Sequence, residues 1–117
     1  MALTYVKGKV KGTRSKQAAV NFLVDSGATY TLLTEKVWKA IGLRPKRKVE
    51  FTLADGTPIM RHVSECFISL PQGEGHTPVI LGETGDEPLL GAITLEELGL
   101  TLNPFNRTLQ PMRALLM

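Results

Sequence analysis

The sequence has only one cysteine and few aromatic residues. Cys66 is the single thiol among 117 residues, and aromatic side chains make up 6% of the chain. A lone cysteine forms no internal disulfide, which excludes a small disulfide-stapled scaffold. Only His62, four positions earlier, could activate the thiol, so we interpret Cys66 as a small apolar residue of a strand and keep a reactive thiol as the alternative. With His76 as the other histidine, the spacing does not suit zinc.

Long hydrophobic runs are also absent. No apolar stretch approaches the roughly 20 residues that a membrane-spanning helix needs. Residues 1–7 lack the apolar core of a secretory signal, so we expect a cytoplasmic protein without membrane contact. The sequence has no glycine-rich phosphate loop, no Gly-x-Ser-x-Gly motif and no alternating acidic calcium loop. We therefore predict no metal and no organic cofactor.

Positive charge is in slight excess and is unevenly distributed. The formal net charge is +3, and basic residues gather in segments 7–16 and 44–48. Such clusters can bind nucleic acid. The second cluster contains no aromatic residue that could stack on a base, so we interpret both as solvated loop rims and expect no nucleic-acid partner. Nucleic-acid binding through 44–48 is kept as the third functional hypothesis.

Glycine and proline interrupt the chain often, and the apolar runs between them are short. This pattern predicts a mostly β protein with a single domain over residues 1–117. The expected strands are 3–10, 18–24, 31–33, 49–53, 58–70, 79–81, 100–102 and 108–109. Two short helices are expected: 35–41, after a possible N-cap at Thr34, and 95–98. Loops are expected at 71–75 and 82–88.

Three glycines have specific structural meaning. Gly42 and Gly99 follow the two expected helices and are typical helix terminators. Both helices follow an apolar segment and a glycine turn, which suggests an approximate internal repeat. Gly56 follows Asp55, and an Asp-Gly pair between two strands is the strongest short hairpin signal. The sequence thus predicts a hairpin centred on 54–57.

The segment around Asp25 is the best candidate for chemistry. This aspartate follows the apolar run 22–24 and precedes Ser26 and Gly27. Burial of a lone carboxylate is costly unless it is hydrogen-bonded or shares a proton. The backbone N–H groups of the next two residues can supply hydrogen bonds, and Gly27 permits close approach of another chain. Asp-Ser-Gly alone is usually only a turn. The buried strand before it, the Asp-Gly hairpin and the apolar segment 89–91 give it more weight.

Three segments together resemble the retropepsin-like aspartic proteases, the single-domain class that includes the retroviral enzymes. They are Val24-Asp25-Ser26-Gly27-Ala28, Asp55-Gly56-Thr57 and Leu89-Leu90-Gly91, in this order and at these separations. The resemblance extends over residues 20–109 and is closest to the cellular and prokaryotic members. It implies a mostly β, closed acid-protease barrel with one or two short helices and a flap hairpin.

The resemblance also implies roles for individual residues. Asp25 matches the catalytic aspartate, and the Ser26 hydroxyl would hydrogen-bond across a dimer axis. Gly27 would contact the substrate backbone, and Ala28 would support the active site. Segment 55–57, with Asp55, Gly56 and Thr57, would be the tip of the flap. One departure is Thr29, which stands where retroviral enzymes place an acidic residue that grips substrate.

The chain has three aspartates, and only Asp25 lies in the motif. Peptide hydrolysis by carboxylates requires one general base and one general acid. Two carboxylates about 3 Å apart share a proton, an established property of aspartic proteases that we apply to this chain. The resemblance therefore implies a homodimeric endopeptidase that hydrolyses peptide or protein substrates, with a water activated by the paired Asp25 carboxylates.

Two questions stay open from the sequence. The alternative function is a non-catalytic dimeric module of the same fold that binds peptides or proteins. The terminal segments 3–6 and 109–117 are candidates for the strands that pair at the dimer interface in the family, and Met112, Leu115, Leu116 and Met117 would be exposed in a monomer. The alternative is a disordered tail or a segment cut from a longer chain.

Overall fold

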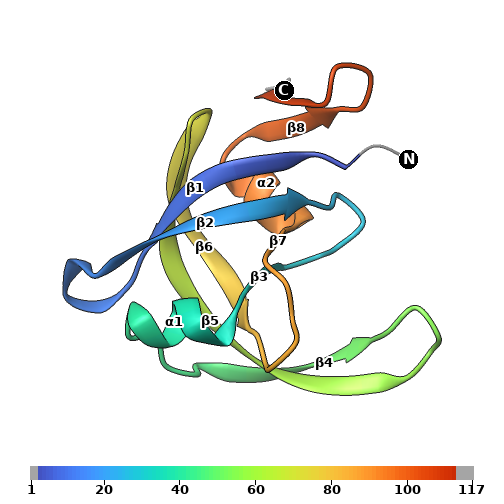
Figure 1. Ribbon diagram of the computed structural model, residues 1–117. Helices are drawn as coiled ribbons and strands as arrows, with labels where there is room; N and C mark the ends of the chain where they lie inside the picture. The colour runs from blue at the N-terminus through green and yellow to red at the C-terminus, as the bar shows by residue number, and fades with distance from the viewer. Residues whose placement is uncertain (1–2, 113–117) are drawn as a thin grey trace, which may run out of the picture.

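The computed structural model describes residues 3–112 and confirms a mostly β protein with two short α-helices (Figure 1). The elements are β1 (Tyr5–Lys11), a 3-10 turn η1 (Thr13–Ser15), β2 (Gln17–Val24), β3 (Thr31–Leu33), α1 (Glu35–Ala40), β4 (Arg47–Thr52), β5 (Pro58–Leu70), β6 (Gly73–Leu81), β7 (Leu89–Leu90), α2 (Ala92–Glu97), β8 (Leu100–Asn103) and β9 (Thr108–Pro111).

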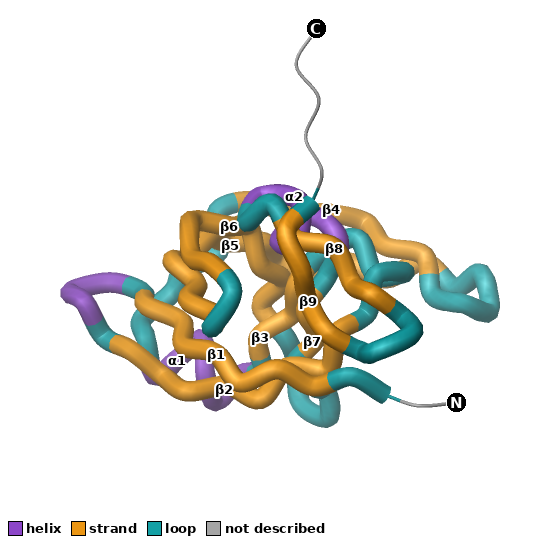
Figure 2. Tube along the Cα trace, turned by 90° about the horizontal axis from the view of Figure 1, so that it is seen from above, coloured by secondary structure: helices purple, strands orange, loops and turns teal. Residues whose placement is uncertain are grey.

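Seven strands form one sheet in the order β1-β2-β7-β3-β6-β5-β4. An additional antiparallel pairing joins β1 to β5, with Val10 opposite Ile68, so the sheet closes into a ring. Strand β4 is outside this ring and pairs with β5, and the hairpin they form extends away from the rest of the chain (Figures 1 and 2). Strands β8 and β9 form a separate two-stranded sheet.

The core fills the inside of the ring because inward positions of the strands alternate with outward ones. In β2, for example, Val20, Phe22 and Val24 are buried, and Phe22 is completely inaccessible. Helix α1 closes one side of this core: Val37 and Trp38 pack against it, and Ile41, just after the helix, is buried. The Trp38 indole N–H also donates to the Gly82 carbonyl at 2.9 Å.

The helix boundaries differ slightly from those expected. Thr34 is confirmed as the N-cap residue of α1, although its side chain makes no capping hydrogen bond. Its carbonyl accepts the N–H groups of Val37 and Trp38 instead. Helix α2 begins at Ala92, three residues earlier than predicted. The expected glycine terminators are confirmed, because Gly42 and Gly99 adopt φ of 75° and 67°.

The predicted strand 58–70 is confirmed as β5, whereas the predicted loop 71–75 is too long, because only residues 71–72 lie between the two strands. Strand β6 begins at Gly73, and its pairing with β5 runs without interruption from Leu70 opposite Gly73 to Val63 opposite Ile80. Glycines at 73 and 75 weaken the local strand signal, but pairing with a long neighbour overrides local propensity. The correction lengthens the strand from the predicted 79–81 to nine residues.

The interpretation of Cys66 as an apolar strand residue is confirmed. Its side chain is buried within β5, and burial raises the pKa of its thiol to about 12. Within residues 3–112, no helix is long and apolar enough to cross a membrane. The same part of the chain contains no cluster of three or more histidine, cysteine or acidic side chains arranged to hold a metal ion.

Candidate active site

The loop that carries Asp25 begins where β2 ends, and neighbouring chain segments fix its first residues. The Val24 N–H donates to the Thr4 carbonyl at 2.8 Å, and the Asp25 N–H donates to the Leu90 carbonyl at 3.0 Å. Leu90 belongs to β7, which runs parallel to β2 with Val24 opposite Leu90. The backbone position of Asp25 is therefore set by a buried sheet and not by the loop alone.

The Asp25 carboxylate is exposed but has a defined orientation. Its Oδ1 accepts the Gly27 N–H at 3.0 Å, and its carbonyl accepts the Ala28 N–H at 3.1 Å. A short side-chain acceptor bonded two residues ahead is the usual Asx-turn geometry. Among the described residues, no other carboxylate and no cation forms a hydrogen bond or ion pair with Asp25. At this loop, one chain thus presents a single carboxylate to solvent.

The segment Leu89–Gly91 and the start of α2 lie directly behind this loop. The Ala92 N–H donates to the Ala28 carbonyl at 2.8 Å, and the Ile93 N–H donates to the Thr29 carbonyl at 3.0 Å. These two N–H groups are in the first turn of α2, where they have no partner within the helix. The early start of α2 is explained by this role, because the helix end satisfies the carbonyls of the Asp25 loop.

Gly91 occupies a position with no room for a side chain. A Cβ at this residue would be 2.4 Å from the carbonyl carbon of Tyr30 and 2.9 Å from the N of Thr31. Its φ is −99°, so the backbone conformation itself is open to any residue. The requirement for glycine is therefore steric, and it comes from the close packing of Gly91 on the Asp25 loop.

A chain of three buried threonines extends from Gly91 into the core. The Gly91 N–H donates to Thr31 Oγ1 at 3.0 Å, Thr31 Oγ1 is 2.5 Å from Thr94 Oγ1, and the latter is 2.7 Å from Thr77 Oγ1. All three residues are at most 2% exposed. The Thr77 hydroxyl donates to the Pro78 carbonyl at 3.3 Å. Each of the three threonine hydroxyls can therefore donate a hydrogen bond, and none of the three is left unpaired.

Sequence reasoning did not identify this threonine network. Thr31 begins β3, Thr77 lies in β6 and Thr94 in α2, so the three positions are far apart in the sequence. The only available signal is a threonine next to apolar residues in each of three short elements. That signal is weak because threonine is also common on the exposed face of strands.

The expected hairpin is confirmed, and its tip contains three predicted site residues. The turn is closed by the Leu53 N–H donating to the Thr57 carbonyl at 2.8 Å, and Gly56 has φ of 88°. Asp55 Oδ1 accepts the Thr57 N–H at 2.9 Å. Hydrogen bonding by Thr57, chiefly through its side chain, lowers the pKa of the Asp55 carboxyl. The turn is therefore closed by hydrogen bonds among its own residues.

The arms of the hairpin, and not its tip, meet the Asp25 loop. A hollow of about 360 Å³ is lined by Gly27 and Ala28 from the loop and by Phe51, Leu53 and Ile59 from the hairpin. The structure thus brings Asp25, Ser26, Gly27 and Ala28 together on one loop. It does not bring Asp55, Gly56 and Thr57 into the same hollow, and a Cβ at Gly56 would have no neighbour within 4 Å among the described residues.

Further contacts, made by Tyr30 and Arg61, join the hairpin arms to neighbouring segments, and the sequence did not point to any of them. Tyr30 packs edge-on against Phe51 with ring centroids 5.4 Å apart, and its hydroxyl accepts a hydrogen bond from Arg47 Nη2 at 3.2 Å. On β5, Arg61 is 3.3 Å from Glu83 Oε2 and 3.8 Å from Asp86 Oδ2. Thr29, which replaces the acidic residue of the retroviral enzymes, is exposed beside them.

One oriented aspartate lies on a tight loop that a short helix braces and a hairpin faces, an arrangement compatible with the aspartic protease resemblance of the sequence. The comparison with known families agrees, because a family model described as aspartyl protease matches residues 6–94. The match includes the Asp25 loop, the hairpin and segment 89–91. No curated protein matches the chain significantly. The chain belongs to the aspartyl protease family, and within it to the retropepsin-like type.

Proposed function

We propose that the protein is an aspartic endopeptidase that is active as a homodimer. The observation that carries this proposal is the single exposed Asp25, whose Oδ1 accepts the Gly27 N–H at 3.0 Å. Peptide hydrolysis by carboxylates needs a general base and a general acid, so a catalytic site built on this carboxylate requires a second carboxylate facing it. Two-fold symmetry about an axis beside the loop would supply the same residue from another copy. The closed barrel of such enzymes is part of the proposal, supported by the β1–β5 pairing that closes the sheet.

In the proposed mechanism, the two Asp25 carboxylates share one proton. The ionised carboxylate takes a proton from a bound water while the protonated one donates to the substrate carbonyl. The water oxygen attacks the carbonyl carbon, and the amine leaves after it receives a proton. The bracing behind the loop suits this role, because catalytic groups work best when they need little reorganisation. The chemistry predicts loss of activity in alkali, when the shared proton dissociates.

The face around Asp25 has the apolar character that a dimer interface requires. Leu3 and Tyr5 are 58% and 55% exposed, and Met112 is 41% exposed. The first two flank Thr4, whose carbonyl bonds to Val24, and Met112 lines a hollow together with Ser26. Both ends of the described chain thus lie near the Asp25 loop. We propose that they contribute to the interface; residues 113–117 of the predicted interface segment lie outside the described residues.

The hairpin is proposed to be the flap that covers a bound peptide. Its arms line the 360 Å³ hollow next to Gly27, and the walls are largely apolar through Leu32, Ile59 and Ile80. An extended peptide lying between the flap and the Asp25 loop would bind by backbone hydrogen bonds, in the manner of an added strand. Its side chains would enter hollows of this kind.

The decisive test is cleavage of a mixed peptide library between about pH 4 and 8, with dimerisation followed by sedimentation. Wild type and Asp25→Asn are compared, and Glu87→Gln serves as a control because Glu87 is exposed and lines none of the hollows described above. We expect cleavage by wild type and by the control, rising with the dimer fraction, and none by Asp25→Asn. No cleavage by a folded wild-type dimer would favour the non-catalytic peptide-binding module. Equal cleavage by Asp25→Asn would reject the proposal.

A further inference from the structure

The two basic clusters of the sequence meet at one groove that is separate from the candidate active site. This groove has a volume of about 700 Å³. Lys11 and Thr13 from the end of β1 and the following turn form one wall, and Arg44 and Lys46 from the segment after α1 form another. Segments that the sequence suggested to be unrelated solvated rims therefore share one concave surface.

The groove carries an excess of positive charge. Three cations line it, Lys11, Arg44 and Lys46, against the single carboxylate of Glu65. Lys46 Nζ is 2.7 Å from Glu65 Oε1, and this contact lowers the pKa of the Glu65 carboxyl, with a smaller effect from His76. Glu65 is thus already engaged by one cation. The other two cations form no ion pair with an acidic side chain among residues 3–112.

The wall formed by the β1–β2 turn is held in place by the end of α1. The Thr13 N–H donates to the Ile41 carbonyl at 3.0 Å, and the Thr13 hydroxyl lies 3.2 Å from the Gly42 carbonyl oxygen. The next two residues, Arg14 and Ser15, adopt φ of 54° and 59°, a left-handed conformation that is unfavourable for residues with a Cβ. The Thr13 hydrogen bonds hold the turn in this strained conformation. This wall of the groove is therefore preformed.

The aromatic side chains of the groove are Phe67 and His76. Lys11 Nζ lies over the Phe67 ring, 5.3 Å from its centroid. His76 packs edge-on against the same ring, with centroids 5.2 Å apart. Single-stranded nucleic acid is usually bound by open aromatic faces beside cations. Lys11 and His76 already contact the Phe67 ring, so the groove offers its positive charge more readily than an aromatic face, which favours an acidic peptide over a nucleic acid.

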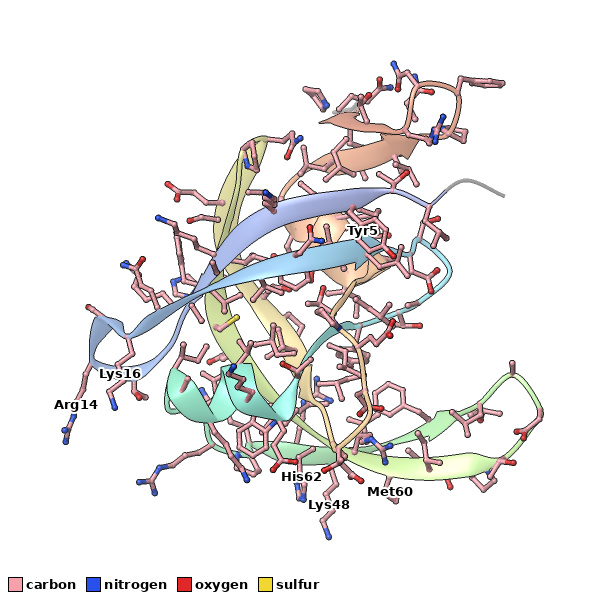
Figure 3. The ribbon with its side chains drawn as sticks, in the orientation of Figure 1. Tyr5, Arg14, Lys16, Lys48, Met60 and His62 are labelled. Atoms are coloured by element: carbon pink, nitrogen blue, oxygen red, sulfur yellow. The ribbon has the colours of Figure 1, made fainter. Side chains whose placement is uncertain are left out.

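The groove and the Asp25 loop are at opposite ends of β2. The turn before β2 contributes Thr13 and Ser15 to the groove, whereas Asp25 directly follows the last residue of the strand. The eight residues of β2 separate the two sites by roughly 25 Å at the usual rise per residue. No residue lines both the groove and either hollow beside the Asp25 loop. Figure 3 shows Arg14 and Lys16 at the turn that borders the groove.

We infer that this groove is a docking site for an acidic peptide segment. It would hold a segment rich in Glu or Asp outside the cleavage site, with the carboxylates near Lys11 and Arg44 and the chain over the apolar floor. That the segment belongs to a substrate rests on the proposed protease function, whereas binding itself does not. A substrate that occupies both sites needs at least about eight extended residues between the acidic segment and the cleaved bond.

The test measures binding of a fluorescent polyglutamate peptide to full-length Asp25→Asn protein at low salt. In the same background, Lys11→Glu with Arg44→Glu is compared with Lys48→Glu, a control on β4 outside the groove (Figure 3). We expect salt-sensitive binding that weakens by roughly tenfold in the double variant and by less than about twofold in the control. Thermal unfolding checks that each variant is folded, and the milder Lys11→Gln and Arg44→Gln replace the double variant if it is not.

Three results would overturn the inference. The first is absence of polyglutamate binding at low salt, and the second is an equal loss of affinity in Lys48→Glu. The third is tighter binding of a thymidine oligonucleotide than of polyglutamate, lost in the same double variant, which would assign the groove to nucleic acid. With the active protein, peptides that join polyglutamate to a cleaved sequence through linkers of increasing length provide a second readout. Cleavage should improve only once the linker exceeds about eight residues; because binding is measured without catalysis, failure of protease activity leaves the first result interpretable.

Discussion

The Asp25 loop and the β4–β5 hairpin face the same hollow but are stabilised in opposite ways. The loop is held from behind by buried contacts: backbone bonds to Leu90 and to the start of α2, tight packing of Gly91, and the threonine network. The hairpin is exposed along most of β4 and at its tip, and its turn is held mainly by its own hydrogen bonds. The two walls of one site thus differ in how much of the core supports them.

This difference suggests a division of roles. A carboxylate that must meet its partner within a few tenths of an ångström benefits from support that leaves it one position. A segment that admits and covers a peptide must open, and such segments are drawn from the less stable parts of a fold. The following substitutions test whether the two regions respond as differently as their contacts imply.

The largest effect is expected for Gly91→Ala. The new Cβ would lie 2.4 Å from the Tyr30 carbonyl carbon, and the neighbour is backbone that cannot rotate away. We expect a loss of about 3 kcal/mol or more in the free energy of unfolding, measured by denaturant titration, or failure to fold. A loss below about 1 kcal/mol would mean that the Asp25 loop can shift to accept the methyl group. The conclusion that buried contacts hold this loop rigid would then be wrong.

The next effect is expected for Thr94→Val, which replaces a hydroxyl at the centre of the buried network by a methyl group. Because Thr31 Oγ1 accepts from the Gly91 N–H, its own proton needs Thr94 as acceptor. We expect a loss of about 1–3 kcal/mol in the free energy of unfolding, since a buried hydroxyl is left without its partner. Thr94→Ser keeps the hydroxyl and removes only a methyl group, so it is the matched control, with an expected loss of about 1 kcal/mol. Equal losses in the two variants would show that packing, and not the hydrogen bonds, matters at this position.

These two positions also show what the sequence could and could not predict. The Asp25 motif, the Asp-Gly hairpin and the apolar segment 89–91 are local patterns, and each was identified with its residues. Strand β5 was predicted with correct bounds because its apolar pattern is long and a proline starts it. The start of β6 was missed, because residues 73–75 form a strand only through their pairing with β5.

The supporting interactions were missed for a different reason. Thr31, Thr77 and Thr94 meet only after the ring of strands closes, so no window of sequence contains the network. The groove that unites the two basic clusters was missed in the same way, because it requires the turn after β1 to pack on the end of α1. Local chemistry was therefore predictable, whereas contacts between distant segments required the structure.

Gly56→Ala is the counterpart of Gly91→Ala in the hairpin. A Cβ here would meet no atom within 4 Å among the described residues, so the cost comes only from φ of 88°. We expect a loss of about 1 kcal/mol, well below that of the Gly91 variant. Denaturant titration of both variants under the same conditions gives the comparison directly. If the Gly56 variant lost as much as the Gly91 variant, the hairpin tip would have to be packed against another part of the protein, such as a second copy.

The smallest effect on stability is expected for Tyr30→Phe. This change removes the hydroxyl that accepts from Arg47 Nη2 at 3.2 Å and keeps the ring that packs edge-on against Phe51. Because the hydrogen bond is exposed, the free energy of unfolding should change by less than about 0.5 kcal/mol.

Hydrogen exchange at the Leu53 N–H, which closes the hairpin turn, provides a local readout that global unfolding does not. Faster exchange there, with unchanged exchange at the Asp25 N–H, would show that Tyr30 steadies the hairpin without affecting the loop. Equal acceleration at both amides would instead show that the two walls open together, and the division of roles between them would have to be abandoned.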